Sequence, residues 1–237
     1  AWATYQEGLS ILARVPNRRV ESALLCSMGE LRRDQGSFEE SLKLYNRALE
    51  LIGLSDPWLR CAVLVSCATL QRWSGKPHEA ESLAEKALQL AEKHELALER
   101  VTAQAALWAA RIALGQAATA REQLEALIAK LREQGARSEL VWAYALLASA
   151  AVNCSDLSAA EEIVQLGLKE AKAIGTLQIL VTEVAYTPAL ESLVVQRAGK
   201  FGELVGALKQ HRSAQMRVRH ALRLRRIEPH ATYSLRV

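Results

Sequence analysis

Tryptophan and arginine side chains lie close together at several points of this sequence, where they could act together in binding. Trp73 directly follows Arg72, and Arg111 lies three residues after Trp108. An indole offers a large apolar face, whereas a guanidinium offers a planar set of hydrogen-bond donors. A ligand with both apolar faces and negative charge would suit this combination. We expect Arg72 and Trp73 to be exposed, so that alanine substitutions would weaken binding and spare stability.

The sequence contains none of the common catalytic or nucleotide-binding motifs. A Gly-x-x-x-x-Gly-Lys-Ser/Thr loop, a Gly-x-Gly-x-x-Gly turn and a Gly-x-Ser-x-Gly elbow are all absent. His78 and His94 each precede a glutamate, but Ser82 and Leu98 stand where a zinc-protease motif needs its second histidine. We therefore predict no catalytic residue, no cofactor and no metal, and we do not expect an enzyme.

The four cysteines are scattered and form no Cys-x-x-Cys pair, so the sequence suggests neither a zinc site nor a redox site. We interpret Cys26, Cys61, Cys67 and Cys154 as buried small hydrophobic residues of a reducing compartment. The longest apolar stretch, residues 140–152, is much shorter than the roughly 20 residues that a membrane-spanning helix needs. We therefore expect a soluble, cytoplasmic protein without a membrane partner.

Positive charge is concentrated near the carboxyl end. The chain has 30 Lys and Arg against 26 Asp and Glu, and residues 209–237 hold eight of the former and one of the latter. Residues 1–208 therefore keep 22 basic and 25 acidic residues. A basic helix predicted at 213–228 carries Arg219, Arg223, Arg225 and Arg226, which could contact nucleic acid or a neighbouring domain. We favour the alternative, in which this helix docks on the last hairpin and its arginines are solvated.

A repeat of about 40 residues organises the chain. Ser41, Ala80, Ala120 and Ala160 occupy equivalent positions, at steps of 39, 40 and 40 residues. Each copy combines a helix, a tight turn and a second helix, and small residues mark where the two helices approach closely. The predicted units are a half repeat at 1–15, repeats at 22–55, 57–95, 100–135 and 138–175, a degenerate repeat at 176–212, the basic helix at 213–228, and the start of a following domain or linker at 229–237. The half repeat suggests a segment cut from a longer solenoid.

Several local signals support these boundaries. Ser37 and Glu40 fit a capping box, while Asp56 before a proline and Pro77 are each placed to open a helix. Pro188 falls inside a helix predicted at 176–196 and should bend it. These signals place the helix ends without reference to any relative.

Trp108 departs from the repeat, because Gly29, Ala68 and Ala148 stand at the equivalent positions of the other copies. A bulky indole at this point would keep the two helices of a hairpin apart. Two alternatives follow: either the third hairpin is splayed, or its first helix is rotated.

The recurring small residues, glycines and alanines or tyrosines resemble the tetratricopeptide family, closely over residues 1–175 and poorly over 176–212. The departure is the period, about 40 residues here against roughly 34 in the family. The resemblance implies an all-α, right-handed superhelical solenoid of antiparallel helix hairpins. Longer, Ala/Leu-rich repeats of this kind are similar to the helical-repeat domains of large bacterial transcriptional activators, of the SARP type and the maltose-regulator type.

That similarity implies a domain that senses a ligand or a partner protein and signals to a DNA-binding domain. The segment from Ala231 to Val237 is similar to the strand that opens the DNA-binding domain of SARP-type activators. DNA would then be contacted only through a domain outside this chain.

In stacked hairpins, the first helix of each repeat lines the concave groove, so its residues outside the core are the binding candidates. These candidates are Glu30, Arg33, Thr69, Arg72, Trp73, Trp108, Arg111, Trp142, Ser149 and Asn153. Alternatively, Trp108 and Trp142 pack between adjacent hairpins. The lysine of the carboxylate clamp in chaperone-binding members of the family has no counterpart, because Ala23, Ala62, Thr102 and Trp142 stand at its positions.

Three functions stay open at this point. The chain could bind a protein, a peptide or a small-molecule effector in the groove of a bacterial regulator. It could equally be a generic protein-interaction scaffold, or its basic helix could bind nucleic acid directly. A homodimer through the exposed ends of the solenoid is a further expectation.

Overall fold

The structure is a computed structural model that describes residues 2–227, with side chains described up to residue 218. All regular elements of this described part are α-helices. They are α1 (Trp2–Leu12), α2 (Arg18–Asp34), α3 (Phe38–Ile52), α4 (Pro57–Trp73), α5 (Pro77–Lys93), α6 (Ala97–Ala113), α7 (Ala117–Glu133), α8 (Arg137–Asn153), α9 (Leu157–Ala173), α10 (Gln178–Ala185), α11 (Pro188–Gln196) and α12 (Ala198–Ile227). The predicted all-α fold of helix hairpins is confirmed.

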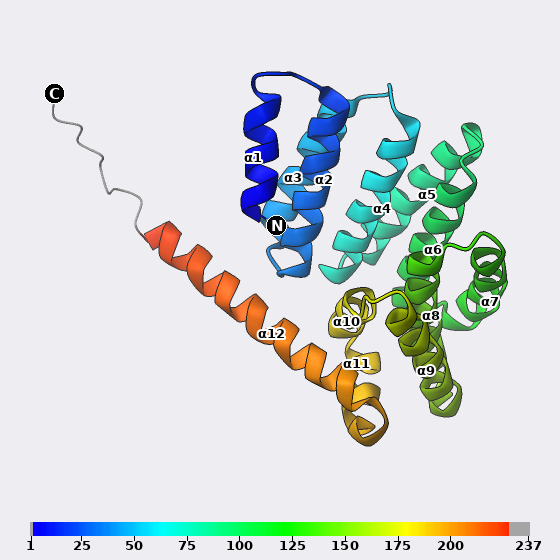
Figure 1. The fold of residues 1–237 in the computed structure, drawn as a ribbon. Coiled ribbons are helices and arrows are strands. Elements are labelled where there is room, and N and C mark those ends of the chain that lie inside the picture. The colour runs from blue at the N-terminus through cyan, green and yellow to red at the C-terminus, as the bar shows by residue number, and fades with distance from the viewer. Residues whose placement is uncertain (1, 228–237) are drawn as a thin grey trace.

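Successive helices pack as hairpins, α2 with α3, α4 with α5, α6 with α7 and α8 with α9. The hairpins stack side by side, and Figure 1 shows them as a curved row that runs from blue to green. The first helices α2, α4, α6, α8 and α10 contact one another from repeat to repeat. These first helices form the inner layer, and the second helices form the outer layer.

Small residues let the two helices of a hairpin approach closely. A Cβ atom added at Gly29 would lie 2.5 Å from Cε1 of Tyr45, whose side chain is fully buried in the same hairpin. The Ser41 hydroxyl donates a hydrogen bond to the carbonyl oxygen of Gly29 at 2.7 Å, so it also fills this narrow space. Ala120 and Ala160, which repeat the position of Ser41, have no exposed surface. The residues that reveal the period therefore lie at the closest helix contacts.

The tight turn inside a hairpin needs one residue in the left-handed backbone region. Gly75 and Gly115 fill this position in the α4–α5 and α6–α7 hairpins, with φ of 78° and 86°. In the α8–α9 hairpin Ser155 takes the same position with φ of 62°. A Cβ is sterically disfavoured in this conformation, whereas glycine adopts it freely. The backbone of the fourth hairpin is therefore strained at Ser155.

All three predicted helix starts are confirmed, because α3 begins directly after Ser37, α4 directly after Asp56, and α5 at Pro77. The Asp56 carboxylate accepts a hydrogen bond from the backbone NH of Leu59 at 3.0 Å, and Pro77 lies in the first turn of α5. The capping box is wrong, because the side chain of Ser37 makes no capping hydrogen bond. Glu40 instead forms an ion pair with Arg32 at 3.0 Å. The carboxylate that should complete the box is thus held by the preceding helix.

The third hairpin is more open than the others, as the splayed alternative predicts. Helix α6 packs more extensively against α5 than against its own partner α7. Trp108 is half-buried and packs beside buried residues of α6, α7 and α8. Its bulk therefore fills space between helices that small residues occupy in the other hairpins.

The last repeat differs from the prediction at its proline. One bent helix was expected at 176–196, but α10 ends at Ala185 and α11 begins at Pro188. Proline lacks a backbone NH and is tolerated at the first helical position, where that donor would have no partner. Pro188 therefore begins a new short helix.

The basic segment is part of a longer helix than expected. A separate helix was predicted at 213–228, whereas α12 continues from Ala198 to Ile227 with one non-helical residue, Phe201. Figure 1 shows α12 extending from the last repeat toward the side of the molecule where the first hairpin lies. The segment 229–237 lies outside the described residues.

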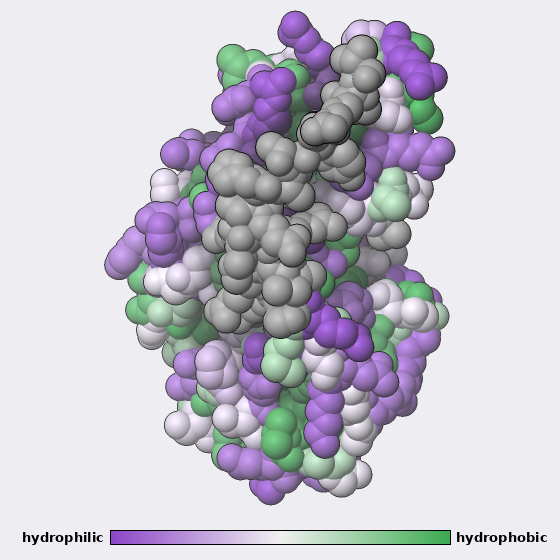
Figure 2. Space-filling view, turned by 90° about the vertical axis from the view of Figure 1, so that its left-hand side faces the viewer, coloured by the Kyte–Doolittle hydropathy of each residue, from purple (hydrophilic) through white to green (hydrophobic). Residues whose placement is uncertain are grey.

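Apolar side chains fill the spaces between neighbouring hairpins along the whole row. Tyr45 near the amino end and Phe201 near the carboxyl end both have no exposed surface. The face of the molecule on the side of α12 is mainly hydrophilic, with apolar side chains only in small patches (Figure 2). No helix in the described part of the chain is long and apolar enough to cross a membrane.

Three of the four cysteines are buried as expected, namely Cys26, Cys61 and Cys67, but Cys154 is exposed. Burial raises the pKa of the Cys67 thiol to about 12. Cys154 caps the carboxyl end of α8, at the strained turn before Ser155, where no neighbouring hairpin covers it. Its expected burial is therefore wrong.

Candidate binding groove

A cavity of about 400 Å³ opens on the inner side of the solenoid. Its walls come from the five first helices α2, α4, α6, α8 and α10. We call it the groove. Because the repeat is 40 residues long, residues one repeat apart form a row across the groove. One such row consists of the residues in the first turns of four successive first helices, Trp58, Leu98, Ser138 and Gln178. A ligand that lies across the groove would therefore meet equivalent positions of successive repeats.

Three tryptophans line the groove. Trp58 is 47% exposed, and Trp73 and Trp142 are half-buried. Trp73 stacks on Tyr186, with ring centroids 4.4 Å apart and an angle of 20° between the rings. Trp58 is thus the exposed tryptophan of the groove, whereas the exposure predicted for Trp73 is wrong, because its ring is covered by Tyr186.

Acidic side chains outnumber basic ones among the residues that line the groove. The five carboxylates are those of Glu30, Asp34, Glu99, Glu139 and Glu183, and the one cationic side chain in the lining is that of Arg33. The carboxylates of Glu99 and Glu139 have no hydrogen-bond or ion-pair partner among the described side chains; the Thr102 hydroxyl bonds only to the backbone carbonyl oxygen of Glu99. The groove surface is therefore negatively charged, contrary to the positive charge that the tryptophan and arginine pairs suggested.

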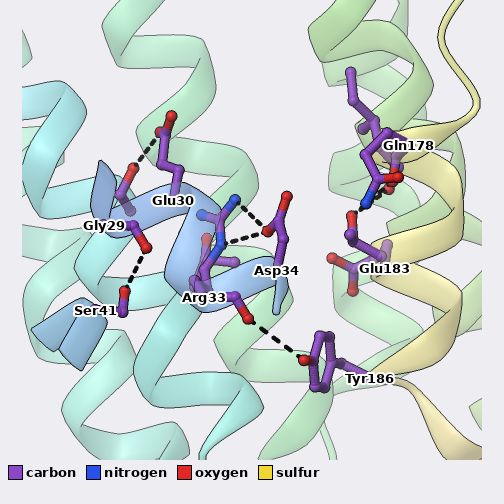
Figure 3. Close-up of polar contacts among 12 residues, drawn as sticks. Gly29, Glu30, Arg33, Asp34, Ser41, Gln178, Glu183 and Tyr186 are labelled. Carbon is purple, nitrogen blue, oxygen red and sulfur yellow. Dashed lines mark hydrogen bonds and ion pairs between the residues drawn. The ribbon is translucent and has the colours of Figure 1, made fainter. Parts of the chain in front are cut away.

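Arg33 is neutralised within its own helix. Its guanidinium lies 3.1 Å from the Asp34 carboxylate (Figure 3). Burial alone would lower the pKa of Arg33, but Tyr45, Asp34 and Glu30 outweigh this effect and raise it. Glu30 accepts a hydrogen bond from the Ser66 hydroxyl at 3.0 Å, which positions its carboxylate without neutralising it.

A buried ion pair joins the second repeat to the last one. The Arg72 guanidinium lies 2.7 Å from the Glu183 carboxylate, and the two side chains are 9% and 1% exposed. The same carboxylate accepts hydrogen bonds from the Trp142 indole NH at 3.1 Å and from the Thr187 hydroxyl at 3.3 Å. Arg72 therefore stabilises the closure of the solenoid and is not exposed as predicted.

Tyr186, directly after α10, connects the groove to the first repeat and to α12. Its hydroxyl donates to the carbonyl oxygen of Arg33 at 3.4 Å, and Figure 3 shows it reaching α2 from the side of α10. The Gln215 amide of α12 donates to the Tyr186 hydroxyl at 2.7 Å and to the carbonyl oxygen of Asp34 at 2.9 Å. Burial lowers the pKa of His211, which packs edge-on against Tyr186. The last elements thus close one end of the groove against α2.

Five of the ten predicted binding residues line the groove: Glu30, Arg33, Thr69, Trp73 and Trp142. Arg72 lies beside it in the ion pair with Glu183. Trp142 also packs against buried residues of neighbouring hairpins, as the alternative interpretation of this residue proposed. Whether these side chains bind a ligand stays a prediction.

The other four predicted residues lie away from the groove. The Arg111 guanidinium pairs with Glu81 of α5 at 2.9 Å and lies 5.0 Å from the centre of the Trp108 ring. Ser149 is buried, and the Asn153 amide donates to its carbonyl oxygen at 2.8 Å. These residues occupy the carboxyl-terminal halves of α6 and α8, whereas the groove is lined by the first turns of those helices.

Sequence reasoning missed Trp58, Glu99, Glu139 and Gln178 of the groove. A signal for them is present, because Trp58, Leu98, Ser138 and Gln178 follow one another at 40-residue steps. The predicted nucleic-acid or domain contacts Arg219, Arg223, Arg225 and Arg226 lie in the part of α12 whose side chains are not described.

Comparison with known proteins places these observations in a family context. A sequence model described as tetratricopeptide repeat matches residues 19–93, which contain the α2–α3 and α4–α5 hairpins. A search of curated proteins finds no match. The sequence match to this repeat model therefore covers the first two complete hairpins.

Solved structures share the fold over nearly the whole chain. Aspartyl phosphate phosphatase F from Bacillus subtilis matches 98% of this chain with a TM-score of 0.58 and 15% identity. A Rap protein complexed with Competence and Sporulation Factor matches 94% with a TM-score of 0.66 and 16% identity. BtubC (BKLC) from P. vanneervenii matches 98%, with 93% of its own length covered, a TM-score of 0.56 and 18% identity.

This chain spans 67% and 62% of the first two structures. At these identities the likeness concerns the fold alone. The chain is therefore a helical repeat scaffold of tetratricopeptide-like hairpins, with tetratricopeptide repeats recognisable by sequence at residues 19–93.

Proposed function

We propose that this chain is the sensing domain of a bacterial transcriptional regulator and binds a peptide segment of a partner protein in its groove. The observation that carries the proposal is the groove itself, about 400 Å³ in volume and lined by five consecutive first helices. Ligand sites typically fall in the range of about 300–1,000 Å³ and combine aromatic walls with a few polar groups. The three tryptophans and the two unpaired carboxylates of Glu99 and Glu139 fit that description.

A peptide suits this groove better than a compact effector. Equivalent side chains recur at 40-residue steps from α4 to α10, so the recognition surface is elongated across the repeats. An extended chain can contact these rows one after another, as repeat proteins commonly bind on their concave face. The Rap protein of similar fold was solved with Competence and Sporulation Factor bound, so a scaffold of this architecture can hold a ligand.

The sensing role is supported by contacts that lead from the groove to α12. The indole NH of Trp142, which lines the groove, donates a hydrogen bond to Glu183 of α10. Tyr186 directly follows α10, and its hydroxyl accepts a hydrogen bond from Gln215 of α12. A ligand that packs on Trp142 would therefore bear, through Glu183 and α10, on the contacts that hold α12 against α2. The regulator assignment also draws on the 40-residue, Ala/Leu-rich repeats, which resemble those of bacterial activators.

A groove-filling variant tests the proposal. Peptides selected from a random dodecapeptide library on the wild-type protein would be synthesised with a fluorescent label and measured by anisotropy. We expect Ala62→Trp, which adds an indole inside the groove, to lower affinity at least about tenfold. Ala118→Trp adds the same side chain to an exposed position of α7 and should leave affinity unchanged.

Selection of no peptide, or equal binding by the two variants, would refute binding in the groove. In the intact regulator, Ala62→Trp should also abolish the transcriptional response to the ligand. A generic interaction scaffold would keep peptide binding but show no such response. Nucleic-acid binding through the basic helix, the remaining alternative, predicts instead a strongly salt-dependent affinity for DNA or RNA.

A further inference from the structure

We infer that the partner segment presents a lysine or arginine side chain, which enters the groove between Glu99, Glu139 and the rings of Trp58 and Trp142, with apolar residues beside it. This inference rests on the proposed function and names the chemistry of the partner. It is carried by the balance of charges in the groove, by the positions of two glutamates, and by the aromatic walls around them.

The carboxylates at the groove are only partly neutralised by the chain's own arginines. Asp34 and Glu183 are neutralised by arginines, at 3.1 Å from Arg33 and at 2.7 Å from Arg72. Glu30, Glu99 and Glu139 form no ion pair with any described side chain. Because every arginine at the groove already has a carboxylate partner, an anionic ligand finds no free cation there. A cationic ligand finds three carboxylates without a counter-ion.

Glu99 and Glu139 lie 40 residues apart, in the first turns of the adjacent helices α6 and α8, and both are half-buried. A glutamate in the first turn also stabilises a helix by its favourable interaction with the helix dipole, but this interaction does not require the side chain to be buried. In the second helices, Glu39 and Glu79 occupy first turns too, and there they are exposed and paired with Lys43 and Lys76.

The pair of glutamates is confined to the middle of the groove. The equivalent residues of the flanking first helices carry no charge: Leu59 in α4 is buried in the core, and Ile179 in α10 lines the groove. Apolar side chains therefore line the groove on both sides of the two glutamates, namely those of Trp58 in α4 and Ile179 in α10. A segment with a basic residue between apolar residues matches this order.

Trp58 and Trp142 line the same cavity as the two glutamates, together with Leu98. A guanidinium or ammonium group over an indole face gains attraction from the ring, more so where water is partly excluded. The indole NH of Trp142 is already bonded to Glu183 at 3.1 Å, so its ring is held in place before a ligand arrives. Carboxylates and indoles together therefore favour a basic side chain over a neutral polar one.

Three pools of fluorescein-labelled nonapeptides test this inference. The pools share random Ala, Leu and Ser at eight positions and differ only in the central residue, which is Arg, Gln or Glu. We expect the Arg pool to bind the wild-type protein at least about tenfold more tightly than the Gln pool, and the Glu pool most weakly. The Arg advantage should shrink when NaCl is raised from 50 to 300 mM, because the attraction is electrostatic.

Two double variants complete the design. Glu99→Gln/Glu139→Gln should bring the Arg pool to the affinity of the Gln pool and leave the Gln pool unchanged. Glu122→Gln/Glu162→Gln removes two exposed glutamates that also lie 40 residues apart, on the outer helices α7 and α9, and should keep the full Arg advantage. The control thus matches the loss of net charge.

The outcomes separate the two proposals. If all three pools bind the wild-type protein equally, or if the Glu99→Gln/Glu139→Gln variant keeps the Arg advantage, the selection of a basic side chain is refuted while peptide binding stands. If no pool binds the wild-type protein, so that Ala62→Trp cannot lower any affinity, peptide binding in the groove is refuted, and this inference is refuted with it.

Discussion

The ion pair between Arg72 and Glu183 should hold the last repeat against the second, and the Glu183→Gln substitution tests this directly. The substitution keeps the size of the side chain but leaves the Arg72 guanidinium, 9% exposed, without its counter-ion. Breaking a buried pair on one side typically costs about 3–5 kcal/mol, because the remaining charge stays desolvated. For a domain of this size each kcal/mol lowers Tm by roughly 2–4 °C, so we expect a decrease of about 6–20 °C.

A double-mutant cycle separates the pair from general damage. Arg72→Met/Glu183→Gln removes the uncompensated charge, so it should be more stable than Glu183→Gln alone by about 1–3 kcal/mol. Hydrogen exchange should accelerate in α10–α12 and remain slow in α4 and α5. Glu162→Gln, an exposed glutamate of α9, serves as the control and should not change Tm. A Glu183→Gln protein that melts within about 2 °C of the wild type would refute this reasoning.

Three further predictions concern stability and reactivity. Ser155→Gly should stabilise the protein by about 0.5–1 kcal/mol in urea unfolding, because relief of strain at φ of 62° exceeds the entropy cost of glycine; a loss of stability would contradict this. Gly29→Ala should destabilise by about 1–3 kcal/mol, since its Cβ would lie 2.5 Å from Tyr45 Cε1, whereas Gly206→Ala, with no atom within 4 Å, should stabilise by about 0.5–1 kcal/mol; equal effects would refute the close approach. A thiol reagent at pH 8 should modify Cys154 at once and Cys61 only after unfolding, because Cys154 is exposed while burial and Glu99 raise the pKa of Cys61 to about 12; rapid labelling of a second cysteine in the folded protein would disagree.

The fold could be predicted from the sequence because the residues that recur in each repeat make contacts within a single hairpin. Ser41, Ala80, Ala120 and Ala160 lie where a second helix crosses its own first helix, about a dozen residues away in the chain. Such contacts are determined by a few neighbouring residues, so their period shows directly in the sequence. The helix starts at Asp56 and Pro77 are local for the same reason.

The composition of the groove is harder to predict because it depends on how each hairpin is rotated against the next. Trp108 and Arg111 lie on a first helix, as groove residues should, but in the half of α6 where Arg111 contacts α5. The Arg72–Glu183 pair joins residues 111 positions apart, and no local pattern identifies such a partner. Arg72 therefore looked like a free cation in the sequence, and the sign of the charge that we expected in the groove was reversed.

Photo-crosslinking from inside the groove tests the central claim most directly. The photoreactive residue p-benzoyl-phenylalanine would be placed at position 62, on the groove wall, or at position 118, on the exposed side of α7. Each protein would be mixed with the peptide of the Arg pool that binds most tightly, and the mixture would be irradiated. Binding along the first helices predicts a strong crosslink from position 62 that unlabelled peptide suppresses, and none from position 118. A crosslink from position 118, or equal yields from both, would place the ligand outside the groove and contradict the account.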